Sequence, residues 1–391
     1  MHKIRSTAGV IFWSTLLLMT VSGQHIAVQF LYEGNSLLEE EKYDEAVLIF
    51  DKAIALDSRF TAAWSNKGYA LSELGEYEDA LEAYDRALEI GPQEALMWNG
   101  KGGALLGMER YDEALKAFDR AIELDPTFAP AWGNKGIAFD RLGRQEDAIR
   151  MYEKVDELNK QDPDPLVWLN KGNSLYKLGD FEEALKSYNK SIEIDPQLAD
   201  AWNSKGLVLG NLSRNDEALK AFDKAIEIDP ALWEAWNNKG VNLNEMGRYE
   251  EAIEAFNQAI EIDSNQTEPW YNKGSTCLRA GKLEEALWSY NKATEIKPEH
   301  AESWIGKGTV LGYMGRYEDA IEALEKAIQI DPENGRAWYL KGLVHNEVNS
   351  DEEAEAAFSR AEELGYVGED SENGDDYVPT KSLLDLLRSL I

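Results

Sequence analysis

Hydrophobic residues recur along this chain with the period of an α-helix, in pairs of short segments. In residues 61–94, one face of a first predicted helix carries Trp64, Gly68, Leu71 and Leu74. Gly75 follows and can adopt the left-handed conformation that ends a helix. A second helix is predicted from about Tyr77 to Ile90, and Gly91-Pro92 stops it. Its apolar face carries Ala80, Leu81, Tyr84, Ala87 and Leu88.

The same unit recurs through most of the chain. Its first marker is a tryptophan, spaced by 34 residues except for one spacing of 36: Trp64, Trp98, Trp132, Trp168, Trp202, Trp236, Trp270, Trp304 and Trp338. A glycine lies four residues after each tryptophan, and an alanine lies sixteen residues after it. Phe30, Gly34 and Ala46 mark an earlier copy. Because a mid-helix glycine costs about 1 kcal/mol relative to alanine, we expect it to permit close approach of the alanine-bearing second helix.

These markers resemble the pattern of the tetratricopeptide repeat (TPR) family, over residues 27–368. The resemblance implies an all-α fold, a right-handed α-solenoid (superhelix) of ten helix-turn-helix repeats, with first helices lining a concave groove. The predicted repeats are 27–60, 61–94, 95–128, 129–164, 165–198, 199–232, 233–266, 267–300, 301–334 and 335–368. One helix pair cannot bury its own apolar stripe, so each repeat is expected to stack on the next.

One regular departure from the family pattern is a lysine three residues after each tryptophan, where the family usually has leucine. We expect the lysine stems to pack beside tryptophan and the ammonium groups to reach nearby carboxylates, rather than to form a functional cationic ridge. Cys277 occupies a position that holds leucine in other copies, and is expected to be an inert buried thiol.

Residues 156–165 hold the two-residue insertion behind the irregular spacing, and Val155 replaces the usual alanine. We therefore expect a weakened interface, or a bend, between repeats 129–164 and 165–198. The alternative is a longer loop with no mechanical effect.

Both ends of the chain differ from the repeats. Residues 1–23 combine Lys3 and Arg5 with an apolar stretch at 8–21 and small residues near Gly23, as in a signal peptide. An uncleaved N-terminal membrane anchor, or an apolar helix that caps the fold, are the alternatives. Residues 369–380 read as an acidic linker. Residues 381–391 read as an amphipathic C-terminal helix that caps the last repeat or binds a partner.

Composition narrows the functional classes. The chain has 391 residues, with 40 Lys and Arg against 73 Asp and Glu, for a net charge of −33. This acidic balance argues against nucleic-acid partners and favours basic or polar protein or peptide partners. A single cysteine excludes an intrachain disulfide and a cysteine-based zinc site. We find no catalytic, phosphate-binding or metal-binding motif, and predict no enzyme activity, no metal and no cofactor.

Asparagine is frequent at positions that face the groove in the TPR family. The candidate groove residues are Asn66, Asn134, Asn170, Asn173, Asn203, Asn237, Asn238, Asn244 and Asn272. Because an amide offers both a donor and an acceptor, such a column can bind an extended peptide backbone. It resembles the asparagine ladder of the TPR superhelix in O-linked N-acetylglucosamine transferases. The alternative is that the amides only solvate a helix face. The two-carboxylate clamp of chaperone-binding TPR domains does not map onto this chain.

Two tryptophans lie outside the repeat pattern and are candidate binding hot spots, Trp288 and Trp233; partial shielding by neighbours is the alternative. The sequence thus predicts a non-catalytic scaffold that binds an extended polypeptide or a protein, outside the cytoplasm if residues 1–23 direct export. If residues 8–21 belong to the fold, a cytoplasmic protein is expected. The alternatives are a self-assembling structural protein and a regulatory subunit of an enzyme encoded elsewhere.

Overall fold

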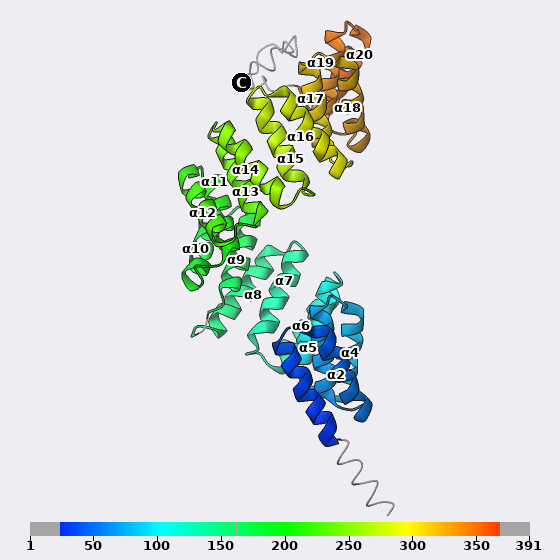
Figure 1. Cartoon of the computed structure of the whole chain (residues 1–391), viewed down its shortest axis with the longest axis vertical. Coiled ribbons are helices and arrows are strands. Elements are labelled where there is room, and N and C mark those ends of the chain that lie inside the picture. Colours follow the sequence, from blue (N-terminus) through cyan, green and yellow to red (C-terminus); the bar gives the residue numbers. More distant parts are fainter. Residues whose placement is uncertain (1–23, 162, 368–391) are drawn as a thin grey trace, which may run out of the picture. The chain divides into compact units, whose positions relative to one another are not determined.

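A computed structural model of the protein describes residues 24–161 and 163–367. All regular secondary structure in these residues is helical, and the helices pack consecutively in pairs (Figure 1). The predicted all-α fold of stacked helix pairs is confirmed. The predicted signal peptide or anchor at 1–23, the acidic linker at 369–380 and the helix at 381–391 lie outside the described residues.

The chain divides into two compact units, and the boundary in the sequence falls between Ile194 and Asp195. In the first unit, residues 24–39 form a helix that precedes the labelled ones. The others are α2 (Tyr43–Leu56), α3 (Thr61–Glu73), α4 (Tyr77–Ile90), α5 (Ala95–Gly107), α6 (Tyr111–Leu124), α7 (Ala129–Arg141), α8 (Gln145–Leu158), α9 (Pro165–Leu178) and α10 (Phe181–Ile194).

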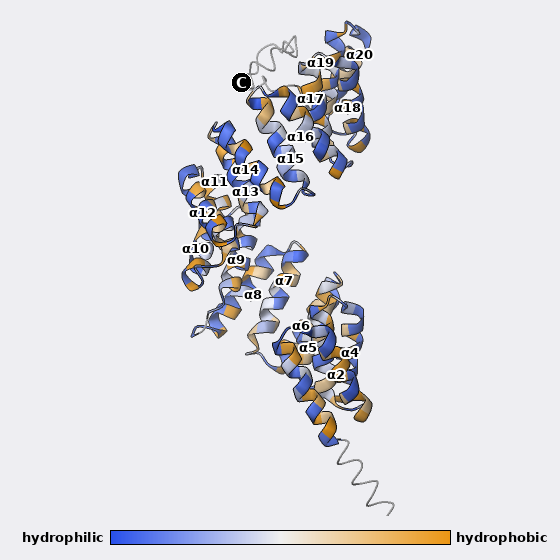
Figure 2. Cartoon of the chain, in the orientation of Figure 1, coloured by the Kyte–Doolittle hydropathy of each residue, from blue (hydrophilic) through white to orange (hydrophobic). Residues whose placement is uncertain are grey.

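The second unit contains five helix pairs in its described residues. They are α11 (Ala199–Asn211), α12 (Asn215–Ile228), α13 (Trp233–Glu245), α14 (Tyr249–Ile262), α15 (Thr267–Arg279), α16 (Leu283–Ile296), α17 (Ala301–Tyr313), α18 (Tyr317–Ile330), α19 (Gly335–Glu347) and α20 (Asp351–Glu363). Hydrophobic and hydrophilic residues share the labelled helices, as expected of helices with one buried stripe (Figure 2).

The core of most repeats contains a contact between the glycine of the first helix and an aromatic ring of the second helix, and in repeat 301–334 Leu324 takes the place of the ring. A Cβ at Gly102 would lie 2.4 Å from Cε1 of Phe118, and one at Gly206 would lie 2.5 Å from Cε1 of Phe222. The second helix therefore approaches as expected. The nearest atoms belong to the ring four residues after the alanine, whereas in repeat 301–334 they belong to Leu324 and to the Ala320 carbonyl.

In most repeats the tryptophan forms a hydrogen bond with the turn that precedes its helix. The Nε1–H of Trp132 donates to the carbonyl of Pro126 at 3.0 Å, and the same bond recurs six residues upstream of most of the other tryptophans. The carboxylate of Asp125 accepts a 2.9 Å bond from the backbone N–H of Thr127 in the same turn. Tryptophan and aspartate thus fix the geometry between consecutive repeats.

The interface at the insertion is closed in the structure. Val155 of α8 and Val167 of α9 are both buried and belong to one cluster with Phe139 of α7. Asp140 adds polar contacts, because its carboxylate accepts from Ser174 Oγ at 2.6 Å and from the Tyr152 hydroxyl at 2.7 Å. The boundary between the two units falls at Ile194, which is not at the insertion. Whether this interface opens first stays a prediction.

Candidate functional site

The first helices of consecutive repeats form one continuous face within each unit. In the first unit α3, α5, α7 and α9 touch in turn, and in the second unit α11, α13, α15, α17 and α19 do the same. The second helices pack instead against the first helix of their own repeat and of the next one. Side chains on the first helices therefore share the inner face of each stack.

Hydrogen bonds between asparagines join neighbouring repeats on this face. Asn134 Nδ2 donates to Asn99 Oδ1, Asn238 to Asn203 and Asn272 to Asn237, each at 3.0 Å. Each bond links the residue after one tryptophan to the second residue after the next. Asn237 and Asn238 are themselves 3.4 Å apart, so four predicted groove residues form one run of amides across α11, α13 and α15.

The remaining predicted asparagines have other partners. Asn66 donates to Asn35 at 2.6 Å, Asn173 accepts from the Tyr188 hydroxyl at 2.9 Å, and Asn244 accepts from Thr276 Oγ1 at 3.1 Å. Asn170 is half-buried, and its backbone carbonyl accepts from Ser174. An amide can make four hydrogen bonds, so one internal bond leaves capacity for a ligand. The column is thus partly a connection between repeats, a role that the sequence analysis did not consider.

A small cavity of about 110 Å³ adjoins this run of amides, between α11 and α13. Asn238, Asn242 and Glu245 contribute polar groups to it. Asn242 is 4% exposed and donates to Asn215 at 3.2 Å, but its own Oδ1 has no partner among the described residues. A buried acceptor of this kind favours a ligand that brings an N–H donor.

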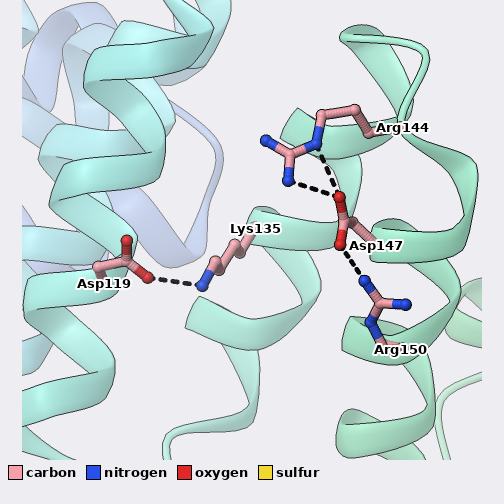
Figure 3. A network of polar contacts seen from close by, with 5 residues as sticks. All are labelled: Asp119, Lys135, Arg144, Asp147 and Arg150. Carbon is pink, nitrogen blue, oxygen red and sulfur yellow. Dashed lines mark hydrogen bonds and ion pairs between the residues drawn. The ribbon is translucent and has the colours of Figure 1, made fainter.

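The lysine column forms ion pairs between repeats. Lys135 of α7 lies 2.6 Å from Asp119 of α6, beside a second network in which Asp147 contacts Arg144 and Arg150 (Figure 3). The same pair recurs at Lys67, Lys101, Lys171, Lys239 and Lys341. The Lys135 ammonium also lies 5.9 Å from the ring centre of Trp132. The structural interpretation of these lysines is confirmed.

Lys273 departs from this arrangement, and its contacts account for the position of Trp288 outside the repeat pattern. Asn257 occupies the position of the acidic partner, and the Lys273 ammonium lies instead 5.8 Å from the Trp270 ring and 5.1 Å from the Trp288 ring. The two rings meet edge to face at 4.8 Å, and Trp288 stays 49% exposed. Trp288 thus combines partial shielding with an open surface. Trp233, at the start of α13, is half-buried.

A larger cavity lies further along the first helices of the second unit and was missed by the sequence analysis. It has a volume of about 300 Å³ and is formed by α15, α17, α19, Tyr290 of α16 and Tyr366. Its aromatic wall contains Tyr271, Tyr290, Tyr339 and Tyr366, and its charged residues are Arg279, Glu302 and Arg336. One feature of the sequence could have indicated this cavity. Tyr271 and Tyr339 take positions that hold asparagine in other repeats, so the asparagine column ends here.

Electrostatics in this cavity centre on Glu302. Its carboxylate accepts from Asn334 Nδ2 at 3.2 Å and lies 3.9 Å from Arg336. Burial, followed by the charge of Glu302, raises the pKa of Tyr271, so that this hydroxyl stays protonated at neutral pH. Arg279 is exposed and forms no ion pair with the described residues.

The remaining candidate features are a single thiol, metal sites and membrane-spanning helices. Burial raises the pKa of Cys277 to about 11, which keeps the thiol protonated and unreactive. No cluster of His, Cys, Asp or Glu with the arrangement of a metal site occurs in residues 24–161 and 163–367. In the same residues, no helix combines the length and the apolar character needed to cross a bilayer.

Among the solved structures that align with the chain, the Cut9–Hcn1 complex supports the fold. The crystal structure of the APC/C hetero-tetramer Cut9–Hcn1 aligns with a TM-score of 0.55 at 21% identity, over 72% of this chain and 55% of that chain. This chain therefore spans about half the length of that structure. Pseudomonas aeruginosa pilF aligns at 21% identity over 55% of this chain and 96% of its own, with a TM-score of 0.48. YrrB, described as a TPR protein with an unusual peptide-binding site, aligns at 30% identity over 49% of this chain and 98% of its own, with a TM-score of 0.40.

Sequence comparison identifies the family. No curated protein matches the chain. Models of the tetratricopeptide repeat match residues 31–95, 95–128, 117–150, 172–213, 199–232, 233–266, 265–333 and 305–365. Together these ranges cover most of the chain, and the helix pairs have the packing that the repeat requires. The chain belongs to the tetratricopeptide repeat family.

Proposed function

We propose that this chain is a non-catalytic scaffold that binds an extended polypeptide along the first helices of its second unit. The observation that carries the proposal is the continuity of polar groups on one face. The amides at 203, 237, 238 and 272 run across α11, α13 and α15, and the larger cavity continues from α15 to α19. Proteins of this family mediate protein–protein interactions, which agrees with such a surface.

Each part of this face suits a different part of a polypeptide. The unpartnered Oδ1 of Asn242 and the spare capacity of the amides suit backbone N–H and C=O groups. The larger cavity, with its tyrosines, suits a side chain that anchors the polypeptide, because buried aromatic pockets concentrate binding energy. Contact along several repeats then gives affinity by summation, with no covalent chemistry.

The net charge of −33 favours a basic or polar partner over most of the surface and predicts faster association at low salt. Export of the chain is a further part of the proposal and is based only on residues 1–23. N-terminal sequencing of the native protein together with cell fractionation tests it. A start near residue 24 indicates cleavage, an intact N-terminus in the membrane fraction indicates the anchor, and an intact N-terminus in the cytoplasmic fraction contradicts export.

The binding proposal is tested with the full-length chain. Captured polypeptides are identified by mass spectrometry, and their affinity is then measured with the double variant Asn238→Ala, Asn242→Ala. We expect affinity to fall about tenfold, because two hydrogen bonds to the ligand are lost. Asn257→Ala, on the exposed side of α14, is the matched control and should bind like the unaltered chain. Equal affinity in all three proteins, with unchanged circular dichroism, would rule out this face as the binding site.

A further inference from the structure

The larger cavity has a charge that is opposite to that of the chain as a whole. Its charged residues are Arg279, Arg336 and Glu302, in a protein whose net charge is −33. Arg336 is held near Glu302 at 3.9 Å, whereas Arg279 forms no ion pair with the described residues. The guanidinium of Arg279 is therefore available to a carboxylate that enters the cavity.

The walls of the cavity add surfaces that suit a peptide. Tyr339 and Tyr366 meet with ring centres 5.5 Å apart, and Tyr271 and Tyr290 meet at 6.0 Å. Tyrosine offers an apolar ring with a polar tip, and is a frequent contact residue at peptide-binding surfaces. The combination of tyrosines and arginines fits a segment that carries both carboxylates and an aromatic residue.

The sequence that follows the cavity has this composition. Tyr366 is part of the cavity, and the described chain ends at the next residue, Val367. Residues 369–376 contain no basic residue and five acidic ones, which are Glu369, Asp370, Glu372, Asp375 and Asp376. Tyr377 follows them. Ten extended residues reach about 33 Å, so the length of this segment does not limit its access to the cavity.

We propose that the larger cavity is a binding site for an acidic peptide segment, and that residues 369–377 of this same chain occupy it in competition with a polypeptide partner. The inference rests on the function proposed above and adds its regulation. A segment attached beside its site has an effective concentration on the order of 1 mM. A site that binds the free segment with a Kd of about 0.1 mM would then be about 90% filled.

The experiment uses full-length chains and a fluorescent peptide with the sequence of residues 368–380. In a neutral-tail variant, Glu369→Gln, Asp370→Asn, Glu372→Gln, Asp375→Asn and Asp376→Asn remove the internal competitor. We expect this variant to bind the peptide about tenfold more tightly than the unaltered chain. Adding Arg279→Gln and Arg336→Gln should abolish the gain. As a control, adding Arg59→Gln instead, at an exposed arginine of the first unit, should leave the gain in peptide binding unchanged.

Two results would overturn the inference: equal peptide binding by the unaltered chain and the neutral-tail variant, or binding that survives loss of both arginines. Carbodiimide cross-linking of the Arg279→Lys variant, made from mixed ¹⁵N-labelled and unlabelled chains, separates the sources of the segment. If every cross-link joins two peptides of the same isotope, the segment comes from the same chain. Cross-links between a labelled and an unlabelled peptide mean that a second copy supplies the segment. Partner binding that depends on Asn238 and Asn242 but ignores neutralisation of the tail would leave the proposed function intact and refute this inference.

Discussion

Asn238 donates a hydrogen bond of 3.0 Å to Asn203, and this bond crosses from one repeat to the next on the inner face of the second unit. Both side chains are half-buried. In an array whose stability is a sum over neighbouring interfaces, a bond of this kind contributes to cohesion as well as to recognition. The two roles are separable by experiment.

Replacing Asn238 with Ala should lower the free energy of unfolding by about 1 kcal/mol, because Asn203 loses its partner. A double-mutant cycle with Asn203→Ala, followed by urea denaturation, should give a coupling energy of about 1 kcal/mol. Additive effects of the two substitutions would mean that the bond adds no cohesion between the repeats.

Gly102→Ala should destabilise its repeat by about 1–3 kcal/mol, because the new Cβ would lie 2.4 Å from Cε1 of the buried Phe118. Gly103→Ala is the matched control in the same helix, since no atom lies within 4 Å of a Cβ there. The control should stabilise the protein by up to about 1 kcal/mol, as alanine does in helices. Thermal denaturation of both variants checks the contrast, and equal shifts would contradict the close approach.

Asn291→Asp should restore to Lys307 the acidic partner that other lysines of the column have. The two residues line the same cavity, and the equivalent pair Lys239–Asp223 lies at 2.7 Å. We expect a gain of up to about 1 kcal/mol that declines in 1 M NaCl. The control is Asn291→Asp made in a Lys307→Met background, where no ion pair can form. A gain that persists without the lysine would show that the ion pair is not its cause.

Cys277 should resist thiol reagents in the native protein, because burial raises its pKa to about 11 and the thiolate is the reactive form. The unfolded thiol titrates near pH 9, so the unfolded state loses its proton first as the pH rises. The contribution of this thiol to stability is therefore complete below pH 9 and decreases from there to about pH 11. Labelling with a disulfide reagent at pH 8 should be slow until urea unfolds the chain; rapid labelling in buffer would contradict the burial.

Hydrogen exchange tests the interface at the insertion. We expect amides of α8 and α9 to exchange before those of α5 and α6, since Val155 and the longer loop depart from the repeat pattern. Asp140→Ala should accelerate this exchange further, because the buried Tyr152 hydroxyl loses its acceptor and Ser174 keeps only the Asn170 carbonyl. Ser187→Ala, which removes a local bond within α10, is the control. Uniform exchange along the first unit would show that the insertion is only a longer loop.

The periodic parts of the fold were predictable from the sequence because each repeat states the same pattern. The second helix expected from about Tyr77 to Ile90 is α4 with those bounds, and Gly75 has the expected positive φ of 79°. For Lys135 the sequence predicted an acidic partner but not which residue it is. The 16-residue separation from Asp119 becomes evident only when two repeats are stacked.

The candidate site was predictable only in part. The asparagines at 203, 237, 238 and 272 lie together as their positions suggested, but their mutual hydrogen bonds depend on the stagger between repeats. The larger cavity could not be foreseen from one repeat. Tyr271, Arg279 and Arg336 come from different positions in two different repeats, and only the packing of α15, α17 and α19 brings them to one cavity.

At two junctions the aromatic ring that faces the glycine of one repeat also fits the residue two after the next tryptophan, whereas Tyr152 and Tyr188 are followed at that position by Asn170 and Ser204. Where the ring is Phe222, the residue at that position in the next repeat is Asn238, which bonds to Asn203. Where the ring is Tyr84, a Cβ at residue 100 would lie 2.7 Å from the hydroxyl, and Gly100 is found there. Tyr290 and Gly306 show the same match. At these two junctions the groups that must fit each other come from different 34-residue repeats, so the stretch that packs correctly runs from one ring to the glycine that it faces in the next repeat. A recombination event that cuts between Tyr290 and Gly306 would yield chimeras with a clash or a void at the junction, whereas a cut just after Gly306 would preserve the fit.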